Sequence, residues 1–207
     1  VLIFDEIISG FRINIGGAQS EYNITPDIST FGKSMANGMP ISAIAGNKKI
    51  MSKMNEIFFS STFGGEALSL VASIETINKI QRTDAINKMK KTGTKLILGL
   101  NDIINKSFLK GAFIFVGPDW WPRLNIVDSK IDITLFKSLL RQELNAAGLI
   151  INATLNLSLS HTEVNIIQET LTRFKIAIDK LSEHIQIKDP QKALKGDLMK
   201  PTFSVRT

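Results

Sequence analysis

The fold is decided by the stretch Val1-Leu2-Ile3-Phe4-Asp5, in which four apolar residues are followed at once by a carboxylate. Such a run is typical of a buried strand. A second strand-like run, Ile28 to Phe31, is followed by Gly32 and Lys33. Open α/β sheets place their ligand sites at the carboxyl ends of the strands. We therefore expect Asp5 and Lys33 to lie at the mouth of the same sheet.

Simpler interpretations of both residues remain open on local sequence alone. Asp5 could cap the next segment or pair with Arg12, and Lys33 could be an ordinary surface lysine. However, Gly32 before Lys33 and the small, flexible stretch from Ser34 to Gly38 leave space beside the amine. A lysine that forms an imine with an aldehyde needs such space and must also lose its proton readily.

The rest of the chain reads as alternating strands and helices. Apolar runs predict strands over 1–4, 28–31, 41–45, 112–116, 123–127, 149–151 and 155–159. Helical spacing predicts helices over 66–79, 84–104, 132–147 and 162–183, with Thr162 as the N-cap of the last one and Gly148 ending the third. Gly93 and Gly99 weaken the second of these helices.

This order of elements predicts an α/β region followed by a smaller α+β unit. We expect a first domain over 1–110, a small carboxyl-terminal domain over 111–187 and a surface tail over 188–207. The chain lacks an initiator Met and opens on a strand already under way, so we expect it to be a fragment.

The composition limits the possible functions. Hydrophobic residues make up 43% and charged residues 21% of the 207 residues, which is the profile of a globular protein. The net charge of +6 is spread thinly, so we expect no nucleic-acid partner. No apolar stretch reaches the roughly 18 to 20 residues that span a bilayer, so we expect no membrane span. With no cysteine, and with His161 and His184 as its two histidines, the chain offers no obvious metal site and suits a reducing, cytoplasmic compartment.

A third element suits a phosphate. The turn from Ser60 to Gly65 carries hydroxyls and glycines just before a predicted helix N-terminus at Glu66, where backbone N–H groups favour anions. A simple N-cap is the plainer interpretation. Taken together, a carboxylate (Asp5), an amine (Lys33) and this turn match the polar needs of pyridoxal 5'-phosphate (PLP), whose pyridine nitrogen a carboxylate keeps protonated.

Several stretches are also familiar as motifs. They are Phe4 to Arg12, Gly16 to Gln19, Thr25 to Asp27, Gly32 to Pro40, and Leu157 to Glu163. They resemble the class III aminotransferases, and within that family most closely the glutamate-1-semialdehyde 2,1-aminomutases and their relatives. The 28-residue separation of Asp5 and Lys33 also matches the family pattern.

The resemblance implies a fold type I PLP-dependent transferase, here with an incomplete major domain, which is a mostly parallel sheet with helices, followed by the small α+β carboxyl-terminal domain. In that family pattern Lys33 is the catalytic residue and carries the cofactor as a Schiff base. Asp5 binds the pyridine nitrogen, and Ile7 packs on one face of the ring. Thr62 donates to the cofactor phosphate of the neighbouring subunit, which implies a homodimer with shared active sites. The substrates implied are a small-molecule amino donor and a carbonyl acceptor.

Two departures from the aminomutase pattern favour alternatives. The segment Leu149 to Thr162 contains no acid, whereas the aminomutases carry a glutamate there. The turn after Ser61 reads Thr-Phe-Gly-Gly-Glu rather than the aminomutase-like Thr-Leu-Ser-Gly-Asn. One alternative is a related transaminase with another carbonyl substrate, such as a sugar-derived one. Another is a truncated, non-catalytic fragment, because the family's front half would precede Val1.

Overall fold

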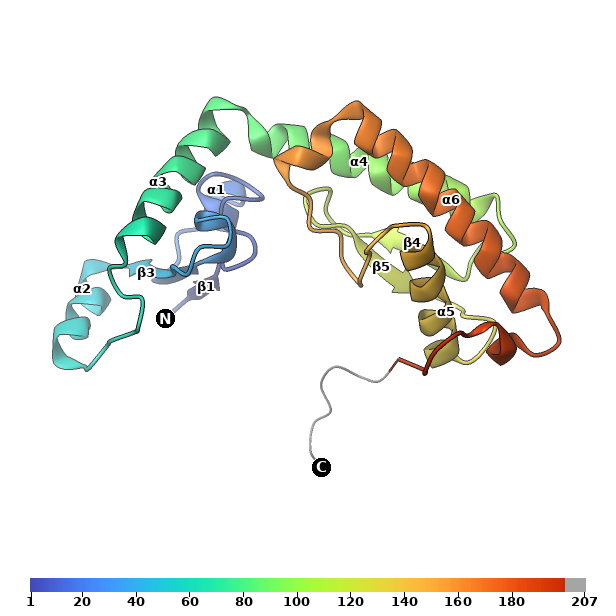
Figure 1. The fold of residues 1–207 in the computed structure, drawn as a ribbon. Coiled ribbons are helices and arrows are strands. Elements are labelled where there is room, and N and C mark those ends of the chain that lie inside the picture. Colours follow the sequence, from blue (N-terminus) through green and yellow to red (C-terminus); the bar gives the residue numbers. More distant parts are fainter. Residues whose placement is uncertain (200–207) are drawn as a thin grey trace. The chain divides into compact units, whose positions relative to one another are not determined.

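The computed structural model describes residues 1–199, and the chain forms two compact units (Figure 1). The first unit is Val1–Lys88, and the second begins at Met89. This division lies earlier than the change of character expected near Lys110, because helix α4 (Ala85–Asn105) packs mainly with the second unit. The domain boundaries of the family's whole fold stay a prediction.

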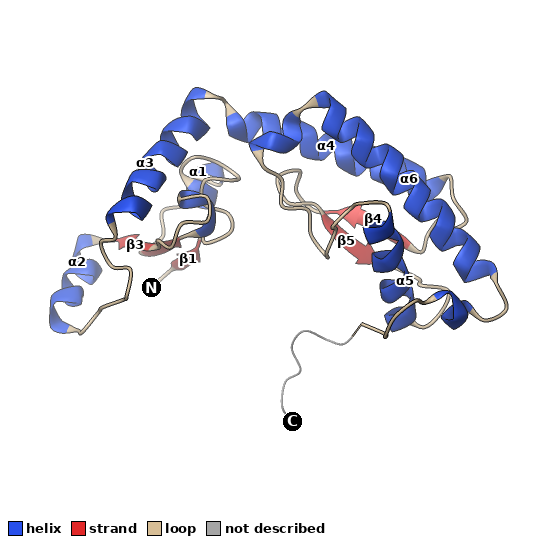
Figure 2. Cartoon of the chain, viewed as in Figure 1, coloured by secondary structure: helices blue, strands red, loops and turns tan. Residues whose placement is uncertain are grey.

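A three-stranded sheet organises the first unit (Figure 2). Its strands are β1 (Ile3–Asp5), β2 (Ile28–Phe31) and β3 (Ala43–Gly46), in the order β1-β2-β3. β1 and β2 are parallel, whereas β3 runs antiparallel to β2. A short helix, α1 (Gly17–Glu21), lies in the connection between the two parallel strands. A strand is present near each of the three predicted places, but only one of the two strand pairings is parallel.

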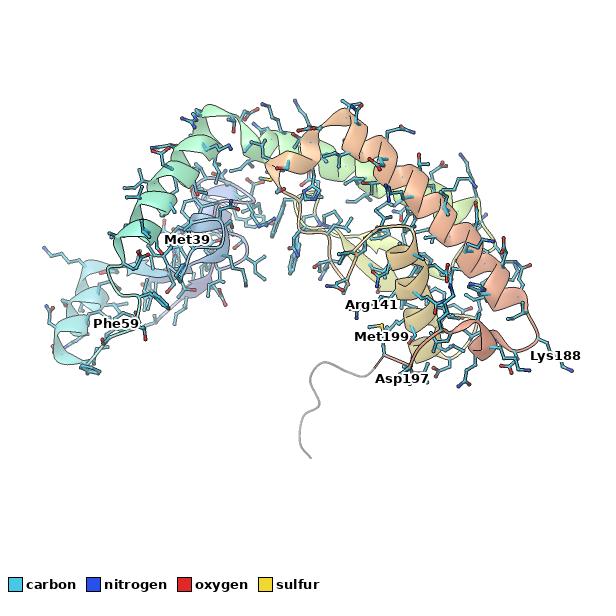
Figure 3. The ribbon with its side chains drawn as sticks, in the orientation of Figure 1. Met39, Phe59, Arg141, Lys188, Asp197 and Met199 are labelled. Atoms are coloured by element: carbon cyan, nitrogen blue, oxygen red, sulfur yellow. The ribbon has the colours of Figure 1, made fainter. Side chains whose placement is uncertain are left out.

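The expectation that the first strand is buried is wrong for the described chain. Ile3 is 59% exposed, and Phe4 is half-buried. Within residues 1–199, β1 pairs only with β2, so its other edge is not covered by a strand. Other apolar side chains of this unit are also open to solvent, including Met39 (40% exposed) and Phe59 (63%), which are labelled in Figure 3.

Helices of the first unit follow the sheet. A 3₁₀ turn, η1 (Lys33–Met35), comes directly after β2, and α2 (Lys48–Met51) and η2 (Ser52–Glu56) follow β3. The long helix α3 (Ala67–Arg82) contacts η1. Its N-cap is Glu66, whose carboxylate accepts hydrogen bonds from two backbone N–H groups of the first turn. The short elements α1, α2, η1 and η2 were not predicted, since none is long enough to show a periodic pattern.

The second unit carries the hydrophobic core. An antiparallel hairpin of β4 (Phe113–Val116) and β5 (Arg123–Ile126) packs with α4, α5 (Ile133–Ala146) and α6 (Val164–Gln186). Alternate residues of β4 face one side, as a strand requires. Accordingly, the rings of Phe113 and Phe136 lie 5.7 Å apart, and those of Phe115 and Phe174 lie 5.8 Å apart, both in edge-on geometry.

Two predictions fail in the segment between α5 and α6. Residues 149–151 and 155–159 are not strands, although Leu124 N and Leu155 N bond to the backbone across this segment and β5. Two such bonds and one isolated bridge do not make a ladder. Thr162 is not the N-cap of α6, because a 3₁₀ turn, η3 (Leu159–Thr162), occupies that position and Glu163 becomes the cap. Gly148 does follow the end of α5, in the left-handed conformation.

The tail lies against α5 as far as it is described. A last 3₁₀ turn, η4 (Pro190–Ala193), and the residues after it make three hydrogen bonds to that helix. The Gln142 side chain donates to the Ala193 carbonyl and accepts from Lys195 N, and Ser138 Oγ accepts from Met199 N. The remainder of the predicted tail, residues 200–207, is outside the described residues.

Candidate functional site

Asp5 and Lys33 come to the same edge of the sheet. Because β1 and β2 are parallel, their carboxyl ends lie side by side. Asp5 is the last residue of β1 and pairs in register with Thr30 of β2. Lys33 follows Thr30 by three residues and begins η1. The two residues singled out in the sequence are therefore neighbours in the topology, although 28 positions separate them in the chain.

One oxygen of Asp5 is held and the other is available. Oδ1 accepts a hydrogen bond from Ile7 N at 3.1 Å and from Thr30 Oγ1 at 3.4 Å. The described structure places no hydrogen-bond donor on Oδ2, and the side chain is exposed. Asp5 Oδ1 thus caps the segment after β1, which is the plainer role that the sequence left open, while Oδ2 stays available to another donor.

Lys33 occupies an unusual backbone conformation. Its φ is +41°, in the left-handed region, which costs about 1 to 2 kcal/mol for a residue other than glycine. Strain of this kind often occurs at functional sites, where the surrounding structure holds it. Next to Lys33, the Ser34 hydroxyl donates to the Gly10 carbonyl at 3.0 Å, and this bond ties η1 to the loop after β1.

Ile7 lies beside the Lys33 segment. A Cβ atom placed on Gly32 would be 3.9 Å from Ile7 Cγ2, which is ordinary van der Waals contact. The Ile7 side chain is only partly buried, so part of its surface is available to a ligand at this edge. The carboxylate, the amine and one apolar side chain are therefore all at the carboxyl end of the β1–β2 pair.

Thr62 belongs to the turn that the sequence suggested for a phosphate. The turn that contains it is exposed, and among the described residues no hydrogen bond joins Thr62 to Asp5 or Lys33. The first amides of α3 are also engaged, because the Glu66 carboxylate accepts from Leu68 N at 2.8 Å and Ser69 N at 2.7 Å. The N-cap of α3 is therefore Glu66 and not a residue of the turn from Ser60 to Gly65, and the phosphate role of Thr62 stays a prediction.

Sequence reasoning did not single out Glu6, although it is the most constrained residue near the site. It is 1% exposed, and its carboxylate accepts from Ala18 N and Gln19 N, at 2.9 and 3.0 Å, and from the Ser9 hydroxyl. The pair Gly16-Gly17 at the start of α1 was the available signal, since glycines permit close approach of another group. Nearby, burial lowers the pKa of the Arg12 guanidinium, which still stays charged at neutral pH.

The groups at the sheet edge fit the polar demands of PLP in part. The Lys33 amine suits the aldehyde of PLP, and the free oxygen of Asp5 suits its pyridine nitrogen. The Ile7 side chain suits a face of the ring. The phosphate has fewer candidate donors, because the Leu68 and Ser69 amides at the start of α3 already donate to the Glu66 carboxylate. The described residues thus account for the reacting end of the cofactor better than for its phosphate.

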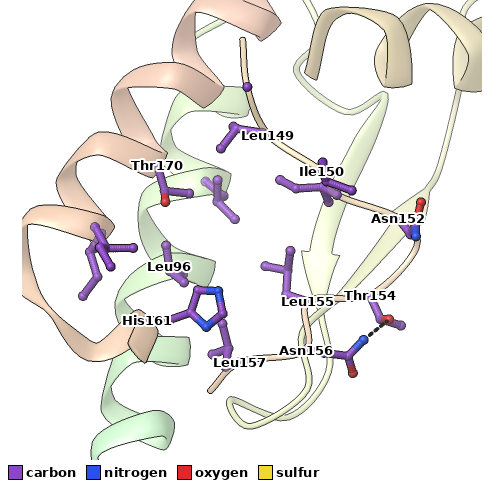
Figure 4. A pocket seen from close by; sticks show the side chains of 15 residues that line it. Leu96, Leu149, Ile150, Asn152, Thr154, Leu155, Asn156, Leu157, His161 and Thr170 are labelled. Carbon is purple, nitrogen blue, oxygen red and sulfur yellow. Dashed lines mark hydrogen bonds between the residues drawn. The ribbon is translucent and has the colours of Figure 1, made fainter. Parts of the chain in front are cut away.

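A separate cavity of about 370 Å³ lies within the second unit (Figure 4). It is walled by Leu96 and Leu100 of α4, by Ile166 and Ile167 of α6, and by the segment from Gly148 to Leu157. His161 also lines it and is fixed by Ser158, whose backbone N–H donates to His161 Nδ1 at 3.0 Å. No carboxylate, lysine or arginine is among the described residues that line the cavity.

The described part of the chain has neither a metal-binding cluster nor a membrane-spanning helix. No group of three or more His, Asp or Glu side chains in residues 1–199 is arranged to hold a metal ion. No helix in the same residues is both long and apolar enough to cross a membrane.

Known proteins of one family are similar to this chain. The family model for "Aminotransferase class-III" matches residues 1–116. The 3-aminobutyryl-CoA aminotransferase of Cloacimonas acidaminovorans is 37% identical over 140 residues, which are 67% of this chain and 33% of that protein. The glutamate-1-semialdehyde 2,1-aminomutase of Francisella tularensis subsp. tularensis is 39% identical over 105 residues, 49% of this chain and 24% of that protein. The matches thus span at most about a third of these relatives' length.

Solved structures show the same fold over about half of their chains. The FumI protein of Sphingopyxis sp. MTA144, in its PLP internal aldimine form, superposes with a TM-score of 0.78 at 24% identity, covering 93% of this chain and 46% of that one. A transaminase with PLP bound gives a TM-score of 0.79 at 20% identity, with 90% and 46% covered. These likenesses establish an α/β fold of the PLP-dependent transaminase type, and the match of the family model over more than half of the chain shows that it belongs to the class III aminotransferases.

Proposed function

We propose that this chain is part of a PLP-dependent aminotransferase or aminomutase in which Lys33 binds the cofactor covalently. The observation that carries the proposal is the parallel pairing of β1 and β2, which puts Asp5 and Lys33 at one sheet edge in a chain of this family. When bound, PLP supplies an electron sink for the carbon that loses or gains a proton. The chain's own residues then have to orient the ring and move that proton.

The family resemblance assigns a role to each residue, and the positions of Asp5, Ile7 and Lys33 support three of these roles. The free Oδ2 of Asp5 accepts a hydrogen bond from the pyridine nitrogen and stabilises its protonated form. Ile7 contacts a face of the ring and excludes water from it. With its amine free, Lys33 would act as the general base and acid for the substrate carbon. Thr62 donates to the phosphate from the neighbouring subunit of a homodimer, and among the described residues it makes no hydrogen bond to Asp5 or Lys33 of its own chain.

The substrate has two candidates. An aminomutase acting on glutamate 1-semialdehyde is supported by the relative in Francisella tularensis. A transaminase with another carbonyl substrate is supported by the absence of acids in residues 149–162, and by the longer match to the 3-aminobutyryl-CoA aminotransferase. Both candidates take a small-molecule amino donor and a carbonyl acceptor, and both agree with a cytoplasmic enzyme.

The experiment tests the covalent bond directly. The protein is incubated with PLP, reduced with borohydride, digested and analysed by mass spectrometry. We expect the cofactor on the Lys33 peptide, none there in Lys33→Ala, and wild-type labelling in the matched control Lys49→Ala, an exposed lysine of α2. Labelling that persists at the same extent on another lysine in Lys33→Ala would contradict the proposal. No labelling of the wild-type protein would favour a non-catalytic fragment.

A substrate panel then separates the two candidates. Protein with bound, unreduced PLP is mixed with glutamate 1-semialdehyde or with a 3-aminoacyl thioester. The loss of the bound cofactor's visible absorption is then followed. A response to the thioester alone favours the transaminase, and a response to the semialdehyde alone favours the aminomutase.

A further inference from the structure

Glu6 lies inside the turn that orients Asp5. The hydrogen bond from Ile7 N to Asp5 Oδ1 closes a turn over one intervening residue, and that residue is Glu6. This bond exists only if the peptide between Glu6 and Ile7 points its N–H back toward Asp5. The conformation of Glu6 therefore sets the direction of the Asp5 carboxylate, although Glu6 does not touch it.

Every polar group of Glu6 is anchored. Its backbone N–H donates to the Thr30 carbonyl at 2.9 Å, and its carbonyl accepts from Gly10 N at 2.8 Å. Its carboxylate accepts from Ala18 N, Gln19 N and the Ser9 hydroxyl, so it caps the amino end of α1. The residue at the N-cap position of that helix, Gly16, makes no side-chain cap of its own.

The contact between Glu6 and α1 leaves no room for another side chain. A Cβ atom on Gly17 would lie 2.5 to 2.7 Å from three atoms of the Glu6 carboxylate, and the φ of Gly17 is +73°. Burial of a carboxylate that is 1% exposed is costly unless its oxygens are bonded. Here two amides and a hydroxyl provide those bonds, so the carboxylate is a rigid link between the end of β1 and the loop that returns to β2.

We propose that Glu6 is a positioning residue for Asp5. Its buried carboxylate fixes the turn over which Asp5 Oδ1 is held, and so keeps Asp5 Oδ2 directed at the pyridine nitrogen. This inference rests on the proposed function, because it takes Asp5 as the partner of that nitrogen. Without the carboxylate, three donors lose their acceptor, the turn relaxes, and Asp5 stabilises the protonated ring less well.

The test compares two helix-capping carboxylates. Glu6→Gln removes the charge at α1, and the matched control Asp132→Asn removes it at α5, where Asp132 Oδ1 accepts from Thr134 N and Leu135 N, each at 2.9 Å. Both substitutions should lower the thermal midpoint of unfolding. The full protein is loaded with PLP labelled with ¹⁵N at the pyridine nitrogen, and the ¹⁵N chemical shift is followed against pH.

We expect Glu6→Gln, and not Asp132→Asn, to lower the proton affinity of the pyridine nitrogen, by about threefold to tenfold, an effect of the size that a misaligned charged partner produces. Asp5→Asn sets the upper limit of the change. Ser9→Ala, which removes one of the three donors and leaves the carboxylate in place, should give a smaller shift in the same direction and covers the case in which Glu6→Gln does not fold.

The outcomes separate the positioning role of Glu6 from the proposed function. If wild-type protein binds the label and the ¹⁵N shift is the same in Glu6→Gln and Ser9→Ala, Glu6 is only a helix cap and this inference is wrong, while the proposed function stands. If wild-type protein shows no bound label, the proposed function itself is wrong and the role of Glu6 falls with it.

Discussion

Asp5 and Thr30 are direct partners across the parallel pair of β1 and β2, and the Thr30 hydroxyl donates to Asp5 Oδ1 at 3.4 Å. This distance is long for an O–H···O bond, so the bond is weak. It nevertheless links the last residue of one strand to the neighbouring strand at the point where both approach Lys33. The orientation of Asp5 thus depends on β2 as well as on its own turn.

Thr30→Val should weaken cofactor binding slightly. The substitution keeps the shape of the side chain and removes the donor, and a weak bond contributes near the lower end of about 0.5 to 1.5 kcal/mol. We expect a rise in the dissociation constant for PLP of about twofold to threefold, measured by fluorescence titration. Thr30→Ser retains the hydroxyl and serves as the control. A loss of more than tenfold in both variants would mean that packing of β2, and not the hydroxyl, decides the affinity.

Gly93→Ala should destabilise the second unit, whereas Gly99→Ala should not. Both glycines lie in α4, where alanine is favoured by about 1 kcal/mol. A Cβ on Gly93 would lie 1.7 Å from the Asp119 carbonyl oxygen, which is backbone and must move. A Cβ on Gly99 would meet the end of the flexible Leu171 side chain at 2.8 Å. We expect a net loss of about 1 to 3 kcal/mol for Gly93→Ala and a change within about 1 kcal/mol for Gly99→Ala.

Chemical denaturation followed by tryptophan fluorescence measures this pair of variants. The chain has two tryptophans, Trp120 and Trp121, and both lie in the second unit, so the signal reports on that unit. Equal stabilities for the two alanine variants would show that the loop around Asp119 yields easily, against the expectation.

Asn101→Asp should make the stability of the same unit depend on pH. Asn101 Nδ2 donates to the Phe115 carbonyl at 2.9 Å, and its Oδ1 accepts from Phe115 N at 2.8 Å. An ionised aspartate retains the second bond but faces the carbonyl with an acceptor, at a cost of about 1 to 3 kcal/mol. Below a pH of about 4 the protonated acid can donate again, so the deficit should shrink. Asn101→Ala lacks this group, and its deficit should stay constant with pH when both variants are unfolded in denaturant.

Glu66→Gln should remove a pH-dependent part of the stability of α3. Hydrogen bonds from the Ser69 hydroxyl, and then from the Ser69 and Leu68 amides, lower the pKa of Glu66 below its ordinary value. A carboxyl whose pKa is lower in the folded than in the unfolded state stabilises the fold above the unfolded pKa, and this contribution is lost as the pH falls through the folded value. The thermal midpoints of wild type and Glu66→Gln should therefore differ at neutral pH and converge in acid.

Glu75→Gln is the matched control for this experiment. Glu75 lies on the same helix, is exposed, and takes no part in its N-cap. Its substitution should leave the pH profile of the thermal midpoint unchanged. A wild-type profile that ran parallel to that of Glu66→Gln over the whole acid range would contradict the proposed cap contribution.

Local patterns were sufficient for much of the fold and for part of the site. The strand at Ile28–Phe31 has the predicted bounds, and the four long helices lie within a few residues of their predicted bounds, because apolar residues repeat along each helix with a fixed period. The positions of Asp5 and Lys33 at the carboxyl ends of their strands could also be predicted, since a polar residue after an apolar run marks the end of a strand.

Long-range contacts explain the errors. Residues 149–159 have the composition of strands, but they find only two backbone bonds to the β5 region and line a cavity instead. Gly93 looked like a weakness in a helix, yet the Asp119 backbone approaches it too closely for any side chain. Neither partner could be identified from the sequence around the residue concerned.

The sequence by itself determined the family, the two strand ends and the amine and carboxylate that they carry, because these depend on residue types at short or fixed spacing. Packing alone shows that the Glu6 carboxylate is buried under the amides of Ala18 and Gln19, and that Asp5 Oδ2 has no hydrogen-bond donor among the described residues. The physical reason is that a carboxylate can be buried only where donors from elsewhere in the chain converge on it, and that convergence is a property of packing.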